Sequence, residues 1–401
     1  MRRGGSPGSR SATAVGVGAF VASWAFGSTP VAVVGAGFLV AAGLSRLWAA
    51  QAAARIHAER LVLSKERIEG GELVVELRIA RSRWLPVGSA AASQRLGANT
   101  ARADVDGRTS RLVFDGIVRG RHELPALELV ARDPLGLERV VIEVGRTEVV
   151  LVRPRIPHLS SLFTHLGAHE AGSARSLLRR PTGFEIHAVR DYTPGEPLRA
   201  VHWPTTARRG RLMVKELDDA PRNDLVVILD EDPDGVAGPP LHSSFDAAVR
   251  AAGALALAEA QAHRRVSIVC TTQGSVPIDI HSPGSDWETA LDRLAAVTPT
   301  PGARIDATLR HPGAAVARAR ELIVVTGRPD RAVAALLEVR LAGRAAAIVA
   351  VASETFAGVT RNRADPALLR AAAAGIRVAI VEAGIPIEHA LARRHAENVG
   401  A

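Results

Sequence analysis

Cysteine is almost absent from this chain of 401 residues, and the single Cys270 cannot form an internal disulfide. This excludes disulfide-stapled secreted folds and zinc modules built from several cysteines. Aromatic residues make up only 3%, and no basic stretch alternates with rings that could stack on bases, so we expect no nucleic-acid partner. A P-loop, a dinucleotide-binding glycine fingerprint, HExxH and CxxC are all missing. We therefore expect a non-enzymatic protein without a cofactor.

Lysine is also scarce, since only Lys65 and Lys215 occur among the 50 basic residues, against 41 acidic ones. Arginine in place of lysine, beside many Ala and Gly residues, is typical of a GC-rich bacterial genome. The net charge of +9 then indicates a solvated basic surface rather than a ligand class.

Charge is missing altogether between Arg10 and Arg46, where the sequence is rich in Val, Ala, Gly, Phe and Leu and is interrupted only at residues 27–30. A membrane helix needs about 20 apolar residues. The pattern predicts a cytoplasmic tail over 1–10 and two transmembrane helices within 11–50, one over 11–27 and one over 30–50. A cleaved signal peptide is the alternative, but the apolar region is longer than a signal sequence requires.

Arginines flank this predicted hairpin on both sides, while its turn carries no charge. They are Arg2, Arg3 and Arg10 before it, and Arg46, Arg55 and Arg60 after it. The positive-inside rule then places both termini and the soluble domains in the cytoplasm, so that we expect a multi-pass protein of the cell membrane in contact with the lipid bilayer.

The soluble part divides into two regions with different patterns. Short alternating runs separated by turn residues over 58–152, with no long helical pattern, predict a small β-sandwich. A linker is expected over 153–182. From 183 to 400, apolar strands such as 225–229 alternate with helical segments such as 244–263, for which Ser244 is a plausible N-cap. This alternation predicts a doubly wound α/β sheet.

Three carboxylates, Asp230, Asp232 and Asp234, follow the first predicted strand of this α/β region. Ligands bind beyond the carboxyl ends of strands in such sheets, and carboxylates at this spacing suit magnesium or calcium. An acidic turn that ends the strand is the alternative, which we favour because Pro233 stiffens the loop.

The segment 183–216 concentrates arginines beside carboxylates, the only tyrosine and a tryptophan. Such residues either fix an irregular loop onto the sheet or anchor a partner, because Trp, Tyr and Arg dominate interfaces. The residues alone leave both open.

This segment resembles the signature of the domain-of-unknown-function 58 family, and 119–122 and 133–137 resemble the stretch that precedes it. The matching positions are Gly183, Glu185, Arg190, Tyr192, Gly195, Arg199, Trp203, Ala207, Arg208, Leu212, Val214, Lys215 and Glu216.

The resemblance implies a von Willebrand factor A-like domain found beside AAA+ ATPases of the MoxR type, and an N-terminal membrane hairpin. Such domains carry a metal-ion-dependent adhesion site that begins D-x-S-x-S. Here Asp230 is kept, but Asp232 and Asp234 replace the serines, Ala303 stands near the expected threonine, and Thr326 follows a later strand where aspartate is usual. We therefore expect the metal site to be lost.

These observations predict a membrane-anchored, non-enzymatic scaffold or adaptor that works with a MoxR-type AAA+ ATPase in protein assembly or envelope processes. Two alternatives stay open, namely a metal-dependent enzyme or binding domain that uses the Asp230 loop, and a passive structural component of envelope assembly. The expected partner-binding residues are Glu185, Arg190, Tyr192, Gly195, Arg199, Trp203, Arg208 and Lys215.

Overall fold

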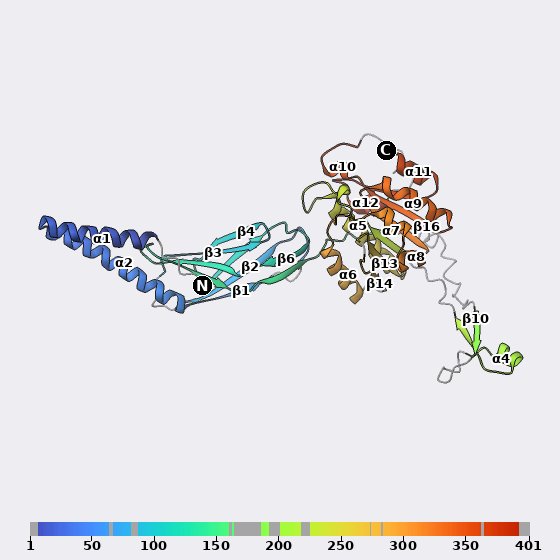
Figure 1. Cartoon of the computed structure of the whole chain (residues 1–401), viewed down its shortest axis with the longest axis horizontal. Coiled ribbons are helices and arrows are strands. Elements are labelled where there is room, and N and C mark those ends of the chain that lie inside the picture. Colours follow the sequence, from blue (N-terminus) through green and yellow to red (C-terminus); the bar gives the residue numbers. More distant parts are fainter. Residues whose placement is uncertain are drawn as a thin grey trace. The chain divides into compact units, whose positions relative to one another are not determined.

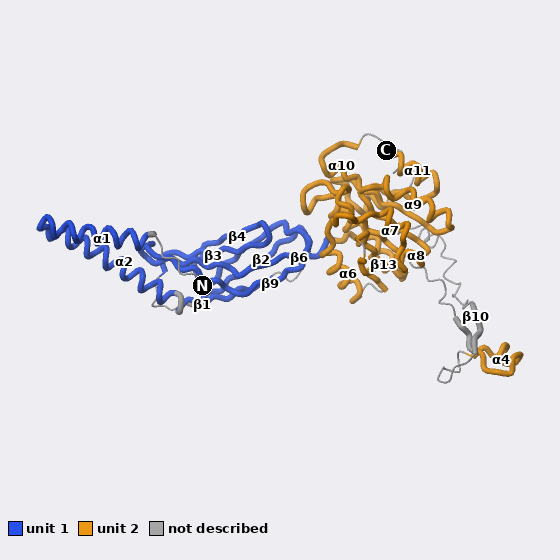
Figure 2. Tube along the Cα trace, viewed as in Figure 1, with its two compact units in different colours: residues 1–155 blue, residues 156–401 orange. Residues whose placement is uncertain are grey.

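The computed structural model describes residues 7–63, 67–81, 87–159, 163, 186–191, 201–217, 225–272, 274–281, 284–361 and 365–392. The chain divides into two compact units, Met1–Arg155 and Ile156–Ala401 (Figure 2). The predicted linker over 153–182 contains this division, and most of its residues lie outside the described ranges.

Two helices open the first unit, α1 (Pro7–Phe26) and α2 (Thr29–Arg55), joined at Gly27 in the left-handed conformation. They pack closely, because a Cβ added to Gly35 would lie 2.9 Å from the carbonyl oxygen of Gly16. Among the described residues, α2 is the one helix long and apolar enough to cross a membrane, over Thr29–Ala52. Membrane association therefore has one candidate span, and the two-span topology stays a prediction.

The last turns of α2 contribute to the core of the first unit, although the candidate span runs to Ala52. Trp48 and Ala52, four residues apart on one face of the helix, are buried among the strands together with Ile56, the first residue of β1. The helix accordingly continues to Arg55, beyond the predicted end at residue 50. The apolar composition predicted the helix, but it could not separate the face that packs on the sheets from the face that stays exposed.

Nine antiparallel strands make up the rest of the described part of this unit, in sheets of order β1-β2-β5, β4-β3-β7-β8 and β6-β9 (Figure 1). Burial alternates along them, most regularly in β5, so inward side chains from all three sheets meet in one core. The strands are β1 (Ile56–Val62), β2 (Leu73–Arg81), β3 (Ser89–Leu96), β4 (Asn99–Asp104), β5 (Thr109–Phe114), β6 (Gly120–Leu124), β7 (Leu127–Arg132), β8 (Arg139–Val144) and β9 (Glu148–Val152).

The second unit contains a two-stranded sheet with a short helix, and a larger sheet covered by helices. The first part comprises β10 (Ile186–Asp191), α4 (Trp203–Arg209) and β11 (Met213–Leu217). The second comprises β12 (Leu225–Leu229), η3 (Pro233–Gly235), α5 (Ser244–Gln261), β13 (Val266–Cys270), β14 (Ile278–Ile280), α6 (Ser285–Ala296), α7 (Ile305–Arg310), α8 (Ala314–Arg318), β15 (Glu321–Thr326), α9 (Pro329–Leu341), β16 (Ala345–Val351), α10 (Ser353–Phe356), α11 (Pro366–Ala373), β17 (Arg377–Val381) and α12 (Ile387–Ala392).

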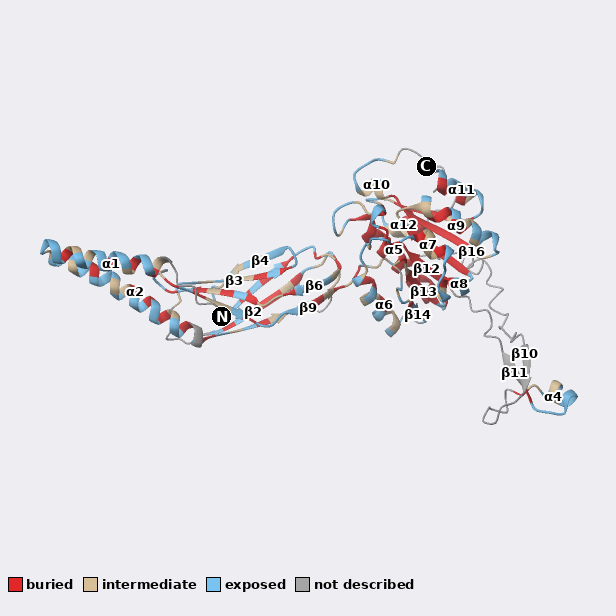
Figure 3. Ribbon diagram, viewed as in Figure 1, coloured by how far each residue is buried: buried red, intermediate tan, exposed pale blue. Residues whose placement is uncertain are grey.

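The larger sheet has the order β14-β13-β12-β15-β16-β17, in which only the edge strand β14 runs antiparallel. Its strands are buried on both faces (Figure 3). Val227 and Leu229 of β12 pack with α5, α6 and α12, whereas Val226 and Ile228 pack with α7, α9 and α11. This confirms the predicted mixed α/β architecture, and it places the reversal of strand order at β12.

Helix α5 begins with a capping box one residue before the predicted cap. The Ser243 hydroxyl oxygen accepts from the Asp246 amide at 3.1 Å, and the Asp246 carboxylate accepts from the Ser243 amide at 3.4 Å. The hydroxyl of Ser244, the predicted cap, instead donates to the Gly235 carbonyl at 3.1 Å and so supports the loop after β12. Adjacent serines made the two roles indistinguishable from the sequence.

Candidate functional site

The candidate site lies at the carboxyl ends of β12 and β15, where the strand order reverses. Ligands of open α/β sheets bind in the crevice at such a switch point. Asp230 follows β12 directly, and Thr326 is the last residue of β15. Both are buried.

Asp230 is held by hydrogen bonds from three directions. Its Oδ2 accepts from the Thr326 hydroxyl at 2.6 Å, and its Oδ1 accepts from the Asp232 amide at 3.2 Å and from the Thr271 hydroxyl at 3.4 Å. Burial nevertheless raises the pKa of the Asp230 carboxyl above its usual value, against these hydrogen bonds. The acceptor positions of this carboxylate are thus engaged by the chain itself.

Asp232 and Asp234 face a guanidinium group. Asp232 is the extended residue just before η3. It caps this short helix, because its Oδ1 accepts from the Asp234 amide at 3.0 Å. Its Oδ2 accepts from Nη1 of Arg331, and Nη2 of the same arginine donates to Asp234 Oδ2 at 3.0 Å. The hydrogen bond with Asp234 raises the pKa of Arg331, which therefore stays charged over the two carboxylates.

Two glycines allow α9 to bring Arg331 to this position. A Cβ added to Gly327 would lie 2.4 Å from the carbonyl oxygen of Gly235, so the loop after β15 and η3 meet backbone to backbone. The Arg328 amide also donates to the Thr326 hydroxyl oxygen at 2.8 Å. The turn into α9 is thereby fixed beside the carboxylates.

The guanidinium of Arg331 occupies the position that a cation between Asp232 and Asp234 would require. In the described part of the chain, no group of three or more His, Cys, Asp or Glu side chains is arranged to hold a metal ion. A metal ion at Asp232 would have to displace Arg331.

Neighbouring groups are equally engaged. Glu231 Oε2 accepts from the Thr272 amide at 2.8 Å, and its carbonyl accepts from the Thr300 amide at 2.9 Å. Burial, aided by the negative charge of Glu231, raises the pKa of the Cys270 thiol to about 12. This thiol stays protonated at neutral pH and is a poor nucleophile.

Of the predicted partner-binding residues, the structure describes the side chains of Trp203 and Arg208. Both lie on α4 and are exposed, Trp203 by 61%. The helix is tied to β11, since the Thr206 hydroxyl oxygen accepts from the Met213 amide at 3.0 Å and the His202 amide donates to the Met213 carbonyl at 2.8 Å.

The remaining predicted residues are placed by backbone only or lie outside the described ranges. Arg190 is paired with Val214, and Lys215 with Val189, so the structure brings these two basic positions onto adjacent strands. Glu185, Tyr192, Gly195 and Arg199 are not among the described residues.

Comparison with known protein families gives a match that includes parts of the signature segment and the Asp230 loop. The family model described as "Protein of unknown function DUF58" matches residues 188–355. This match, from β10 to α10, confirms the resemblance to the domain-of-unknown-function 58 family over that range.

Two further comparisons are more distant. Uncharacterized protein YeaD of Bacillus subtilis (strain 168) is 25% identical over 114 residues, which cover 28% of this chain and 29% of that protein. The chain therefore aligns with less than a third of the length of this curated relative. Cwp6 from Clostridium difficile aligns with a TM-score of 0.13 and 10% identity over 81% of this chain and 49% of that one, too weak a likeness to carry an argument.

Proposed function

We propose that this protein is a membrane-anchored, non-enzymatic scaffold or adaptor that engages an AAA+ ATPase of the MoxR type in protein assembly or envelope processes. The observation that carries the proposal is Trp203, a tryptophan left exposed on a helix that is fastened to its sheet. Tryptophan and arginine are the residues most often found at binding hot spots.

The contacts at the carboxyl ends of β12 and β15 support the non-enzymatic part of the proposal. Asp230, Asp232 and Asp234 are engaged by Thr326 and Arg331, and the Cys270 thiol stays protonated. The carboxylates that could act as base or metal ligand at the switch point thus join the loops, and the one cysteine thiol there is held in its protonated form.

The same edge of the sheet supports a von Willebrand factor A-like fold. The loop that resembles the start of an adhesion site lies at the carboxyl end of β12, beside the strand-order reversal. In this proposal Arg331 takes over the neutralising role of the metal ion, and partner binding no longer depends on a metal.

Crosslinked capture from native membranes tests the partner. Tagged full-length protein, Trp203→Ala and Arg208→Ala are compared with and without ATP, and captured proteins are identified by mass spectrometry. We expect the wild-type chain to enrich an AAA+ ATPase in a nucleotide-dependent way, and each variant to recover several-fold less.

Two variants serve as matched controls. Leu341→Ala removes another exposed apolar side chain, and Arg209→Ala removes the arginine next to Arg208. Both should keep full recovery. If all four variants recover the same set of proteins as wild type, α4 is not the interface, and if only envelope-assembly proteins are recovered, the structural role is correct instead.

The proposed anchor includes both helices as membrane spans, with both termini in the cytoplasm. In a Cys270→Ser background, single cysteines at Ser28 and Asp106 report their side of the membrane to an impermeant maleimide. We expect Ser28→Cys, in the turn, to be labelled from outside intact cells and Asp106→Cys only after lysis. Labelling of Asp106→Cys in intact cells, with Ser28→Cys labelled only after lysis, would mean that the topology is the reverse of the proposed one.

A further inference from the structure

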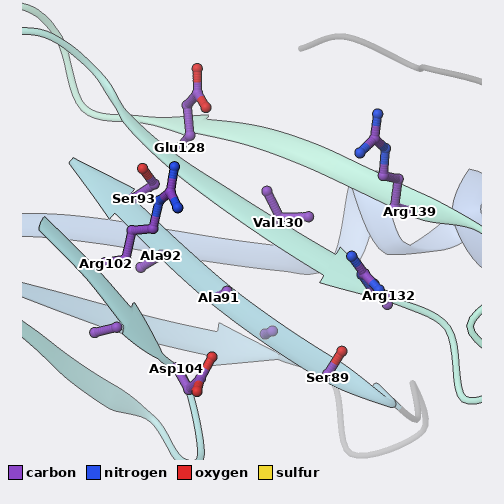
Figure 4. A pocket seen from close by; sticks show the side chains of 12 residues that line it. Ser89, Ala91, Ala92, Ser93, Arg102, Asp104, Glu128, Val130, Arg132 and Arg139 are labelled. Carbon is purple, nitrogen blue, oxygen red and sulfur yellow. The ribbon is translucent and has the colours of Figure 1, made fainter. Parts of the chain in front are cut away.

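A groove of about 760 Å³ runs along the outer face of the four-stranded sheet in the first unit (Figure 4). Its floor is made of the small side chains Ser89, Ala91 and Ser93, which alternate along β3. Longer side chains from the neighbouring strands form its walls, namely Arg102 and Asp104 on β4, Glu128, Val130 and Arg132 on β7, and Arg139 on β8.

Two arginines stand opposite each other at one end of this groove. Arg132 and Arg139 are directly paired across β7 and β8, and both are exposed. Within the described part of the chain, neither guanidinium has a hydrogen bond or an ion pair. Like charges directly opposite across a sheet are destabilising. An anion bound between them would remove this repulsion.

The turn between these arginines contacts the N-terminal helices. Ser45 of α2 donates to Asp133 Oδ2 at 2.7 Å, and Ser9 of α1 donates to Glu138 Oε1. All four side chains are buried. Asp133 also accepts from the Glu138 amide at 2.7 Å, so one carboxylate both shapes the turn and ties it to α2.

These contacts lie at the boundary of the uncharged part of the helices. Arg10 follows Ser9 and Arg46 follows Ser45, and no charged residue lies between them. Arg46 Nη2 donates to Thr13 Oγ1 at 3.1 Å, which places this end of the apolar part of α2 beside the start of α1. The tip of the turn exposes Leu135 by 59%. An apolar tip beside arginines, at the end of an apolar helix, fits the headgroup layer of a bilayer.

We propose that Arg132 and Arg139 bind the phosphate group of an anionic lipid in the leaflet from which the helices emerge. The inference rests on the membrane anchor of the proposed function. Guanidinium groups bind phosphate oxygens through paired hydrogen bonds, and two such arginines are paired here with no carboxylate of the described residues bonded to either. The open groove behind them admits the rest of the headgroup.

Native mass spectrometry of the detergent-purified full chain tests this site. The protein is equilibrated with equal amounts of phosphatidylglycerol and phosphatidylcholine, and the ratio of the lipids retained is measured. We expect wild type to favour phosphatidylglycerol by about tenfold, since each arginine near a surface contributes several-fold. Arg132→Ala/Arg139→Ala should bring the ratio close to one, and Arg132→Lys/Arg139→Lys should keep most of the preference.

The matched control is Arg95→Ala/Arg121→Ala, which removes two exposed strand arginines of the same unit. It should retain the wild-type preference. The proposal is overturned if the Arg132/Arg139 alanine variant keeps the full preference, or if the control loses it equally, which would indicate general surface charge.

Carbonate extraction separates this proposal from the anchor. An integral protein stays with the membranes whichever arginines are present. Extraction of the wild-type chain would overturn the anchor and the headgroup site together. Retention of wild type, combined with an unchanged lipid ratio in the alanine variant, would overturn the headgroup site alone.

Discussion

Two arginine clusters, one in each unit, differ in whether the chain supplies their countercharge. Around the β12 loop of the α/β unit, Arg331 faces Asp232 and Asp234 and neutralises them. On the outer sheet of the first unit, Arg132 faces Arg139, and neither is neutralised by a described residue. A charged cluster whose countercharge comes from the chain itself holds parts of the fold together. A charged cluster without such a countercharge is instead suited to bind a charged ligand.

Three buried charged residues in the α/β unit show the same pairing of an arginine with two carboxylates. Arg264 donates to Glu259 at 2.9 Å and to Glu321 at 2.7 Å, and all three side chains are almost fully buried. The two carboxylates hold the pKa of Arg264 above its usual value, although burial acts against this. The triad joins the end of α5 to the start of β15.

The largest expected effect is that of Arg264→Met, which should lower the free energy of unfolding by about 3 to 5 kcal/mol, because two buried carboxylates lose their countercharge. Hydrogen exchange in β12 and β15 under increasing denaturant measures it. Replacing all three residues with apolar ones should restore much of the loss. A loss below about 1 kcal/mol would show that the triad is not a countercharge system.

Arg331→Ala should have a smaller effect, about 2 kcal/mol, because Asp232 is buried while Arg331 is about a quarter exposed. Asp234 keeps Arg328 at 3.7 Å, but the buried Asp232 carboxylate loses its ion pair, so millimolar Mg²⁺ or Ca²⁺ should recover part of the stability of the variant. Calorimetric titration and thermal unfolding measure both effects. Arg340→Ala, at the other end of α9, is the control. If the wild-type protein binds these metal ions as strongly as the Arg331→Ala variant does, the role given to Arg331 is wrong.

The third effect, smaller again, is the pH-dependent change in stability expected for Asp230→Asn. Burial raises the folded pKa of Asp230 above its ordinary value, so the folded state takes up this proton more readily than the unfolded state. Stability from this group is therefore present at acidic pH and falls as pH rises through the folded pKa. Asp230→Asn should be slightly more stable than wild type at neutral pH, and the difference should vanish near pH 4. If the difference in stability between the variant and wild type grows on acidification, the folded pKa of Asp230 is lowered rather than raised.

The smallest effect on stability is expected for Arg132→Ala/Arg139→Ala. Neither side chain has a partner within the described residues, and their mutual repulsion is removed, so the change should stay within about 0.5 kcal/mol. Hydrogen exchange in β7 and β8 measures it. A large loss would place these arginines with Arg264 and Arg331 as structural residues.

The sequence predicted most of the α/β unit because buried parallel strands read as continuous apolar runs. The runs 225–229, 266–269 and 346–351 correspond closely to β12, β13 and β16. It did not reveal β3, whose Ser and Ala residues lack strand propensity and are held by pairing with β4 and β7. Tertiary pairing outweighed local preference there.

The candidate site was predicted in part. Asp230, Asp232 and Asp234 could be found because they follow a strand directly. Arg331 could not, because it lies about a hundred residues further on and nothing in its spacing links it to the loop. The countercharge depends on packing between α9 and η3, which the local sequence does not encode. The same applies to Ser45, whose partner Asp133 lies 88 positions away.

The direct passage from α2 into β1 has a mechanical consequence. Arg55 ends the helix and Ile56 begins the strand, with no intervening linker. The turn at Asp133 forms a second, separate attachment between the sheet and the helices. Two attachments oppose swivelling about either one, so a rotation of the helices in the bilayer turns the β-sheets by the same angle. If the proposed membrane anchor is correct, the first unit would pass a rotation of these helices on to its β-sheets.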